Sequence, residues 1–124
     1  MNTKYKGDLS VGRAINYYLS IQYEVLLPIG DKKKYDMVID DGVKILKIQC
    51  KYTSFKTEYG IFRAQLKVCG GNSGRKLYHY VKGDFDILFI TTSDNSIYII
   101  PFSEIDGMTT SITLGKKWEK FKIK

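Results

Sequence analysis

Residue types that support several common kinds of enzyme are scarce in this chain of 124 residues. It has two cysteines and one histidine, which are too few for a zinc site of thiolates and imidazoles or for a disulfide framework. No Ser-His-Asp or Cys-His set surrounds His79, which we interpret as structural. We expect Cys50 and Cys69 to be reduced thiols, as in intracellular proteins.

Long apolar runs are also missing. No run approaches the ~20 residues that a membrane-spanning helix needs, and the N-terminus lacks a basic segment followed by an apolar one. The sequence therefore predicts a cytoplasmic protein with no membrane partner. The chain shows no repeat or low-complexity linker, and its length suits one domain over residues 1–124.

Basic residues are abundant. Lys and Arg number 20 against 13 Asp and Glu, which gives a formal net charge of +7. Such an excess favours a polyanionic partner, and the ten tyrosines among the basic residues could stack on bases or donate to phosphate. The alternative is a basic surface that only keeps the protein soluble.

The hydrophobic pattern predicts one helix followed by a mostly antiparallel set of strands. The helix is expected over residues 7–22, capped by Asp8 or Ser10. The other expected elements are strands at 23–27, 35–40, 43–53, 84–92 and 96–101, a polar hairpin at 55–68 and a short helical turn at 103–107. In the basic tail we expect Trp118 and Phe121 to dock on the core; the alternative is that the tail binds DNA or another subunit.

An Asp-Gly pair at 41–42 stands between two apolar-rich runs and predicts a two-residue hairpin loop. With this loop, Asp40 pairs with Val43 and Asp36 lies opposite Lys47.

Side chains alternate between the two faces of such a hairpin. One face collects the polar residues Asp36, Lys47, Gln49 and Lys51. The other collects the apolar residues Met37, Ile39, Leu46, Ile48 and Cys50, which should be core. Folding does not require a carboxylate, an amide and two ammonium groups on a half-buried strand pair, so the polar face is a candidate functional site. The alternative is an ordinary exposed strand face.

The polar face resembles the active site of the PD-(D/E)XK nucleases, which have the restriction-endonuclease fold. Tyr35-Asp36 fills the acidic position, and Gln49-Cys50-Lys51 fills the (D/E)XK position with glutamine in place of the acid. Matching flanking segments are found at Tyr23–Pro28, Tyr35–Val38, Ile48–Thr53, Gly83–Leu88 and Ile97–Pro101. The resemblance covers roughly residues 6–102, leaves 103–124 as a basic C-terminal extension, and is strongest to homing endonucleases encoded in bacterial group I introns.

This resemblance implies a mixed α/β (α+β) fold with a restriction-endonuclease-like core, in which a helix flanks a mixed β-sheet and a β-hairpin region is added. It also implies a Mg²⁺ site, for which Ca²⁺ or Mn²⁺ could substitute. Asp36, the amide oxygen of Gln49 and the backbone carbonyl of Cys50 would be the ligands. Lys51 would position or deprotonate the attacking water or offset charge on the phosphate.

One position departs from the family. A glutamate on the first helix of these nucleases points into the metal site, and Val11 occupies the expected position here. Valine cannot bind a metal, so the substitution predicts impaired cleavage, unless the alignment is displaced by a residue or two. Asp8 lies three residues earlier on nearly the same helical face.

Candidate DNA contacts lie around Lys32, in the polar hairpin region and around Lys76. Each of these regions could instead be a solvated loop or sheet edge that does not contact DNA. In the polar hairpin region, Arg63 and Gln65 share a face that could read guanine and adenine in the major groove. The complete set of expected DNA-binding residues is Lys32, Lys33, Thr53, Ser54, Lys56, Arg63, Gln65, Lys67, Asn72, Arg75 and Lys76.

The sequence thus predicts a site-specific endonuclease of the homing type that hydrolyses double-stranded DNA. Cutting both strands needs two active sites, so we expect a homo-oligomer, at least a dimer and by analogy with related enzymes even a tetramer. Two alternatives stay open. One is a catalytically silent DNA-binding module of nuclease ancestry, and the other is a basic structural or RNA-associated protein with a chance motif.

Overall fold

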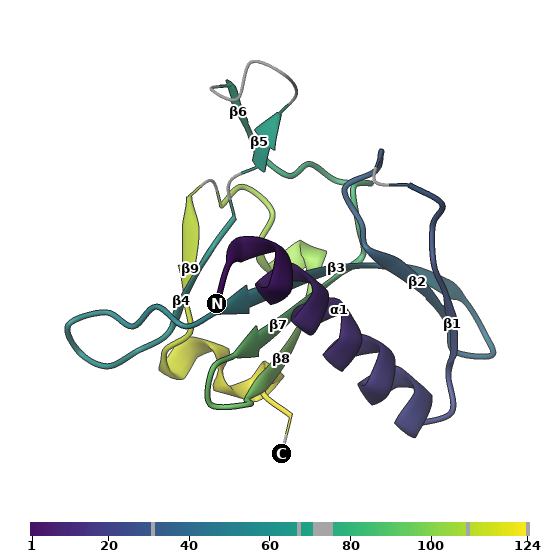
Figure 1. Cartoon of the computed structure of the whole chain (residues 1–124), viewed down its shortest axis with the longest axis horizontal. Coiled ribbons are helices and arrows are strands. Elements are labelled where there is room, and N and C mark those ends of the chain that lie inside the picture. Colours follow the sequence, from purple (N-terminus) through teal and green to yellow (C-terminus); the bar gives the residue numbers. More distant parts are fainter. Residues whose placement is uncertain (31, 67, 71–75, 109, 124) are drawn as a thin grey trace.

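The main sheet has five strands in the order β1-β2-β3-β7-β8 in the computed structural model of the chain (Figure 1), which describes residues 1–30, 32–66, 68–70, 76–108 and 110–123. The strands are β1 (Glu24–Leu26), β2 (Met37–Asp40), β3 (Ile45–Thr53), β7 (Ile87–Thr92) and β8 (Ile97–Pro101). The central pair β3 and β7 is parallel and the other pairs are antiparallel, so the expected mixed sheet is confirmed.

Smaller elements surround this sheet. Two separate two-stranded ribbons pair β4 (Arg63–Gln65) with β9 (Ser111–Thr113), and β5 (Val68–Gly70) with β6 (Lys76–Tyr78). Two 3-10 helices, η1 (Phe102–Glu104) and η2 (Lys116–Phe121), lie in the C-terminal part of the chain.

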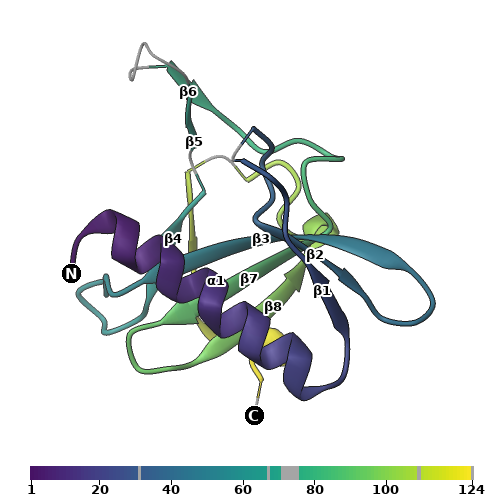
Figure 2. The same cartoon turned by 45° about the vertical axis from the view of Figure 1, so that its right-hand side comes forward.

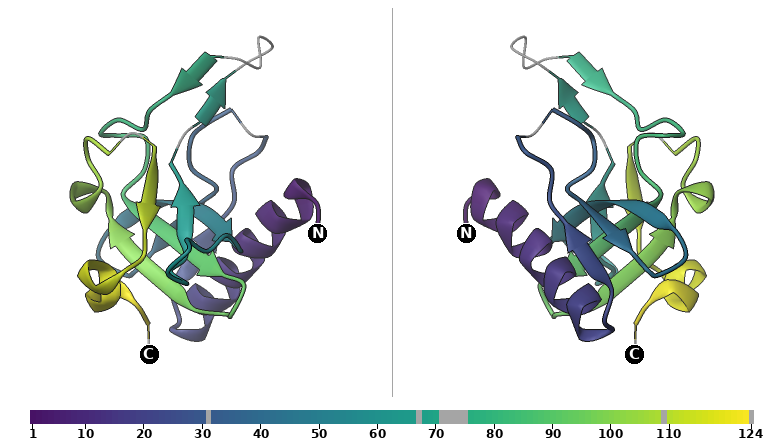
Figure 3. Two further views of the ribbon diagram at one scale, coloured as in Figure 1. Left: turned by 90° about the vertical axis from the view of Figure 1, so that its left-hand side faces the viewer. Right: turned by 90° about the vertical axis from the view of Figure 1, so that its right-hand side faces the viewer.

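The α-helix α1 (Thr3–Ser20) crosses one face of the sheet, and the C-terminal elements cover the other face (Figures 2 and 3). On the helix side, Ala14 and Tyr18 pack against apolar residues of the sheet that include Met37, Ile48 and Phe89. A larger core on the opposite side joins β7 and β8 to the β4–β9 ribbon and η2. Each face of the sheet therefore has its own hydrophobic core.

The helix begins earlier than the sequence suggested. The expected start at residue 7 and the cap at Asp8 or Ser10 are wrong, because Asn2 is the N-cap and its side chain accepts a 3.0 Å hydrogen bond from the backbone N–H of Tyr5. Asparagine is among the best N-cap residues, so the cap itself is ordinary. Asp8 and Ser10 lie within the helix, where Ser10 is buried.

The β2–β3 loop is two residues longer than expected. Asp40 pairs with Ile45 and not with Val43, and the same shift moves Lys47 away from its expected place opposite Asp36. The aspartate before the loop glycine accepts backbone N–H bonds of 2.8 Å from two following residues, which stabilises the longer loop. A shift of two residues preserves the faces of a strand, so the predicted division into a polar and an apolar face survives.

The polar hairpin region has a different partner strand from the one expected. A bridge between Lys56 and Phe62 closes a short hairpin at its start, but β4 then pairs with β9 from the C-terminal segment. The ribbon that carries Arg63 and Gln65 therefore joins two distant parts of the sequence.

The C-terminal tail docks on the core, as expected. The Trp118 side chain is only 4% exposed and belongs to the larger core, against which Phe121 also packs. In the part of the chain that the structure describes, no helix is long and apolar enough to span a membrane.

Candidate active site

Asp36, the residue before β2, is held against β3 by two hydrogen bonds. Its backbone N–H donates to the carbonyl of Ile48 at 2.8 Å, and its carboxylate Oδ2 accepts from the backbone N–H of Cys50 at 2.7 Å. The second bond orients the half-buried side chain toward β3 and leaves the other carboxylate oxygen for a further partner.

Gln49 and Lys51 lie on β3 with their side chains on the face that the sequence predicted. The Gln49 amide lies beside the backbone carbonyl of Cys50, with 3.5 Å between Nε2 and the carbonyl oxygen. The ammonium of Lys51 lies over the ring of Tyr80, 5.4 Å from its centroid. Tyr80 is itself buried and packs edge-to-face on Phe85, with 4.9 Å between ring centroids. The buried ring therefore forms a platform for the lysine.

The two charged groups of the site influence each other. Burial raises the pKa of Asp36, while the hydrogen bond from the Cys50 N–H and the positive charge of Lys51 act in the opposite direction. Burial lowers the pKa of Lys51, and the Asp36 charge opposes that shift. Both pKa shifts reflect a partly desolvated site, where electrostatic interactions with a charged ligand are stronger than in water.

The oxygen donors present are compatible with a hard divalent cation. Asp36 offers one carboxylate oxygen, and Gln49 and Cys50 offer an amide and a carbonyl oxygen once the Gln49 amide group is turned. Only one of these donors carries charge. Among the described residues, no group of three or more His, Cys, Asp and Glu side chains is placed to hold a metal.

Val11 and Asp36 line the same small hollow, and the role expected for position 11 stays a prediction. Both residues line a hollow of about 240 Å³, together with Leu27, Pro28, Gly30, Lys33 and Tyr35. Val11 also packs on the core under the helix. A longer acidic side chain at this position would start from the wall of a hollow that Asp36 also lines.

Lys47, which shares the polar face in the sequence pattern, is engaged elsewhere. Its ammonium donates to the carbonyl of Gly83 at 2.6 Å and lies over the ring of Tyr35. Its backbone N–H donates to Asp86 at 2.8 Å. Lys47 thus joins β3 to the segment before β7.

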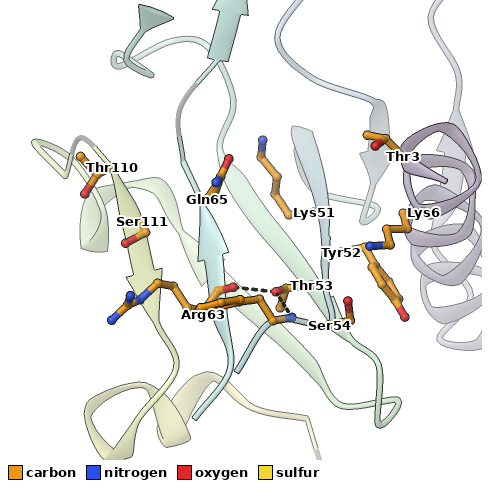
Figure 4. A pocket seen from close by; sticks show the side chains of 11 residues that line it. Thr3, Lys6, Lys51, Tyr52, Thr53, Ser54, Arg63, Gln65, Thr110 and Ser111 are labelled. Carbon is orange, nitrogen blue, oxygen red and sulfur yellow. Dashed lines mark hydrogen bonds between the residues drawn. The ribbon is translucent and has the colours of Figure 1, made fainter. Parts of the chain in front are cut away.

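A larger cleft of about 610 Å³ opens next to Lys51 (Figure 4). Four of the expected DNA-binding residues line it: Thr53, Ser54, Arg63 and Gln65. Thr53 is nearly buried, and its hydroxyl donates to the carbonyl of Arg63 at 2.6 Å, so it fixes the wall of the cleft.

The other expected DNA contacts are more scattered. Lys32 and Lys56 are exposed, and Lys33 lines the hollow beside Asp36. Lys67, Asn72 and Arg75 lie outside the described residues, and Lys76 is placed only as a backbone position of β6.

Three residues near the site were missed by sequence reasoning. Tyr80 stands in an aromatic stretch that has no periodic pattern, so only the fold shows that it lies under Lys51. Thr3 and Lys6 line the large cleft but were left outside the helix, because its start was placed at residue 7. The Asn2 cap was the signal that could have included them.

The family of this chain is shown by a match to a family model. The model of the PD-(D/E)XK endonuclease family matches residues 1–122. The chain belongs to the PD-(D/E)XK endonuclease family. It is therefore a nuclease by family, and members of this family generally use divalent metal ions.

A solved structure agrees with this assignment. The bacterial homing endonuclease I-Ssp6803I is similar to this chain with a TM-score of 0.80 and 26% sequence identity, over 94% of this chain and 80% of that one. The restriction-endonuclease-like fold expected from the sequence is thereby confirmed. No curated protein matches the sequence significantly.

Proposed function

We propose that this protein is a site-specific endonuclease of the homing type that hydrolyses phosphodiester bonds of double-stranded DNA with Mg²⁺. The observation that carries the proposal is the hydrogen bond that sets the Asp36 carboxylate against Cys50, the residue of β3 between Gln49 and Lys51, within electrostatic reach of the Lys51 ammonium. Family membership and the similarity to a homing endonuclease support the reaction type and the substrate.

Asp36, Gln49 and the carbonyl of Cys50 would hold the Mg²⁺. A divalent cation held by these residues would supply a Lewis acid that polarises the phosphate and favours ionisation of a water molecule. The Cys50 N–H keeps the Asp36 carboxylate oriented toward β3, so little ordering remains to be done when the cation binds.

Lys51 is the group that would contact the scissile phosphate of the substrate. Its ammonium, supported by the Tyr80 ring, would offset the negative charge that develops on the phosphate as water attacks phosphorus and the bond to the leaving oxygen breaks. The alternative role for Lys51 is that of a general base: burial lowers its pKa, and its neutral amine, in place of the ammonium, would then accept the proton of that water.

Val11 favours a second candidate function. Because an apolar side chain shares the hollow with Asp36, the site has one carboxylate where the family has two. A DNA-binding module of nuclease ancestry, without cleavage activity, would have this arrangement.

Cleavage of a cognate duplex separates the two candidates. Duplexes would first be selected from a randomised pool by binding in Ca²⁺, then incubated with Mg²⁺ and the wild-type chain, Val11→Glu, or Val11→Glu combined with Lys51→Ala. Val11→Glu combined with Lys44→Ala is the matched control, because Lys44 is an exposed lysine of the β2–β3 loop.

We expect feeble cleavage by the wild-type chain, strong cleavage by Val11→Glu and by its Lys44→Ala control, and none by the Lys51→Ala combination. If no variant cuts a duplex that it binds specifically, the binding module replaces the endonuclease. Equal cleavage by the Lys44→Ala and Lys51→Ala combinations would remove Lys51 from the active site.

A further inference from the structure

The large cleft beside Lys51 has two walls from distant parts of the chain. One wall is the first two turns of α1, and the other is the β4–β9 ribbon, with the end of β3 between them (Figure 4). The lining residues of α1 are Thr3 and Lys6. The Lys6 side chain extends from the helix toward the cleft.

The charge of the cleft has one sign. Its lining contains three basic side chains, Lys6, Lys51 and Arg63, and among the described residues that line it there is no Asp or Glu. The remaining polar side chains are hydroxyl and amide groups, which can donate to phosphate oxygens. Basic side chains along a concave site raise the positive potential there, and this favours an anionic ligand of extended shape.

The far wall is already ordered. The carbonyl of Arg63 accepts from the Thr53 hydroxyl at 2.6 Å, and its guanidinium Nε donates to the Thr113 hydroxyl at 3.0 Å. The wall that carries Arg63 would therefore need little rearrangement on binding.

We propose that this cleft binds the sugar–phosphate backbone of one DNA strand next to the scissile phosphate, and that Lys6 makes a phosphate contact from α1. The proposal rests on the proposed function for the identity of the polyanion. Because Lys51 lines the cleft and also belongs to the active site, a strand in the cleft continues directly to the reacting phosphate. The first turns of α1 thus form one wall of the proposed DNA-binding cleft.

The chain contains a matched control for Lys6. Lys4 lies on the same helix two residues earlier, is exposed, and is not among the residues that line the cleft. Successive helical residues are about 100° apart around the axis, so the two lysines point in nearly opposite directions. Replacing either by alanine removes the same charge from the same helix.

The experiment measures binding and needs no cleavage. The fluorescence anisotropy of a labelled selected duplex is titrated with wild type, Lys6→Ala and Lys4→Ala in Ca²⁺ over a series of NaCl concentrations. We expect Lys6→Ala to weaken binding about 3- to 10-fold and to reduce the slope of log K against log salt by about 0.9, the value for one lost phosphate contact. Lys4→Ala should stay within about 2-fold of wild type.

The outcomes separate this proposal from the proposed function. If Lys6→Ala binds as Lys4→Ala does, the cleft proposal is overturned whether or not the protein cuts DNA. If Lys6→Ala alone loses affinity and salt slope, the cleft proposal stands, even where Val11→Glu fails to cleave and the endonuclease is replaced by the binding module.

Discussion

At the scale of single residues, the candidate site depends on a few backbone contacts and on one substitution. Asp36 is oriented by the Cys50 N–H, and Lys51 rests on the Tyr80 ring. Val11 occupies the wall of the hollow that Asp36 lines. A second carboxylate there would add a charged oxygen ligand, which is the kind that Mg²⁺ and Ca²⁺ prefer.

Val11→Glu should raise the affinity for Ca²⁺ about tenfold or more, measured by isothermal titration calorimetry. Without metal, the same change should lower the free energy of unfolding by about 1–3 kcal/mol, because a carboxylate enters a half-buried site next to Asp36. Added Ca²⁺ should reverse that loss.

Val11→Gln is the control, because it has nearly the same shape without the charge. It should gain much less affinity than Val11→Glu. Unchanged Ca²⁺ affinity in Val11→Glu would mean that residue 11 does not face the metal site.

At the scale of elements, turns and docked segments hold the sheet that positions the site. The β7–β8 turn is closed by Asp94, whose carboxylate accepts from the Thr92 hydroxyl and, at 3.1 Å, from the Ser96 N–H. These hydrogen bonds hold the pKa of Asp94 below its ordinary value. On the opposite face, Trp118 docks η2 onto the core.

Asp94→Ala should lower the free energy of unfolding at pH 7 by about 0.5 kcal/mol, because the hydrogen bonds are lost from an exposed side chain. A depressed pKa in the folded state means that Asp94 stabilises the protein above its unfolded pKa, and that this stability is lost as the pH falls through its folded pKa. The difference from wild type should therefore shrink in urea titrations as the pH falls below about 4, the ordinary pKa of aspartate. A constant difference at all pH values would contradict this assignment; Asp106→Ala serves as an exposed aspartate outside the turn.

Trp118→Ala should lower the free energy of unfolding by about 3–5 kcal/mol in urea titrations, because it removes a buried aromatic side chain from the larger core. Lys116→Ala, an exposed change in the same 3-10 helix, should stay within about 0.5 kcal/mol of wild type. A small loss for Trp118→Ala would show that the C-terminal segment contributes little to the fold.

At the scale of the whole molecule, the net charge and the exposed side chains indicate what kind of partner the protein could bind. The net charge of +7 suits a polyanion. Large apolar side chains are exposed at both ends of β2, including Ile29 at 100% in the preceding loop and Val43 at 93% in the following one.

We predict that the protein forms at least a dimer, because two strands of a duplex need two active sites. Light scattering during size-exclusion chromatography, with and without a selected duplex, should give at least twice the monomer mass. A strictly monomeric protein that nevertheless cuts both strands in one binding event would exclude this assembly.

Much of the site could be predicted from the sequence, because its signals are local. An alternating pattern fixes which strand residues share a face, so Asp36, Gln49 and Lys51 could be grouped although the loop length was wrong by two residues. The helix was expected to start at residue 7 but starts at Thr3, because Asp8 and Ser10 were taken as caps in place of Asn2. Thr3 and Lys6 were therefore left out of the predicted helix.

The family and the alternating faces of β2 and β3 could be predicted from the sequence alone, and so could the grouping of Asp36, Gln49 and Lys51 as a candidate site, since these depend on residue type and short spacing. Only the tertiary structure decided that β3 pairs in parallel with β7, that β4 pairs with β9, and that Tyr80 supports Lys51. Those contacts join residues far apart in the chain. Their formation depends on how whole faces pack together, which no local pattern encodes.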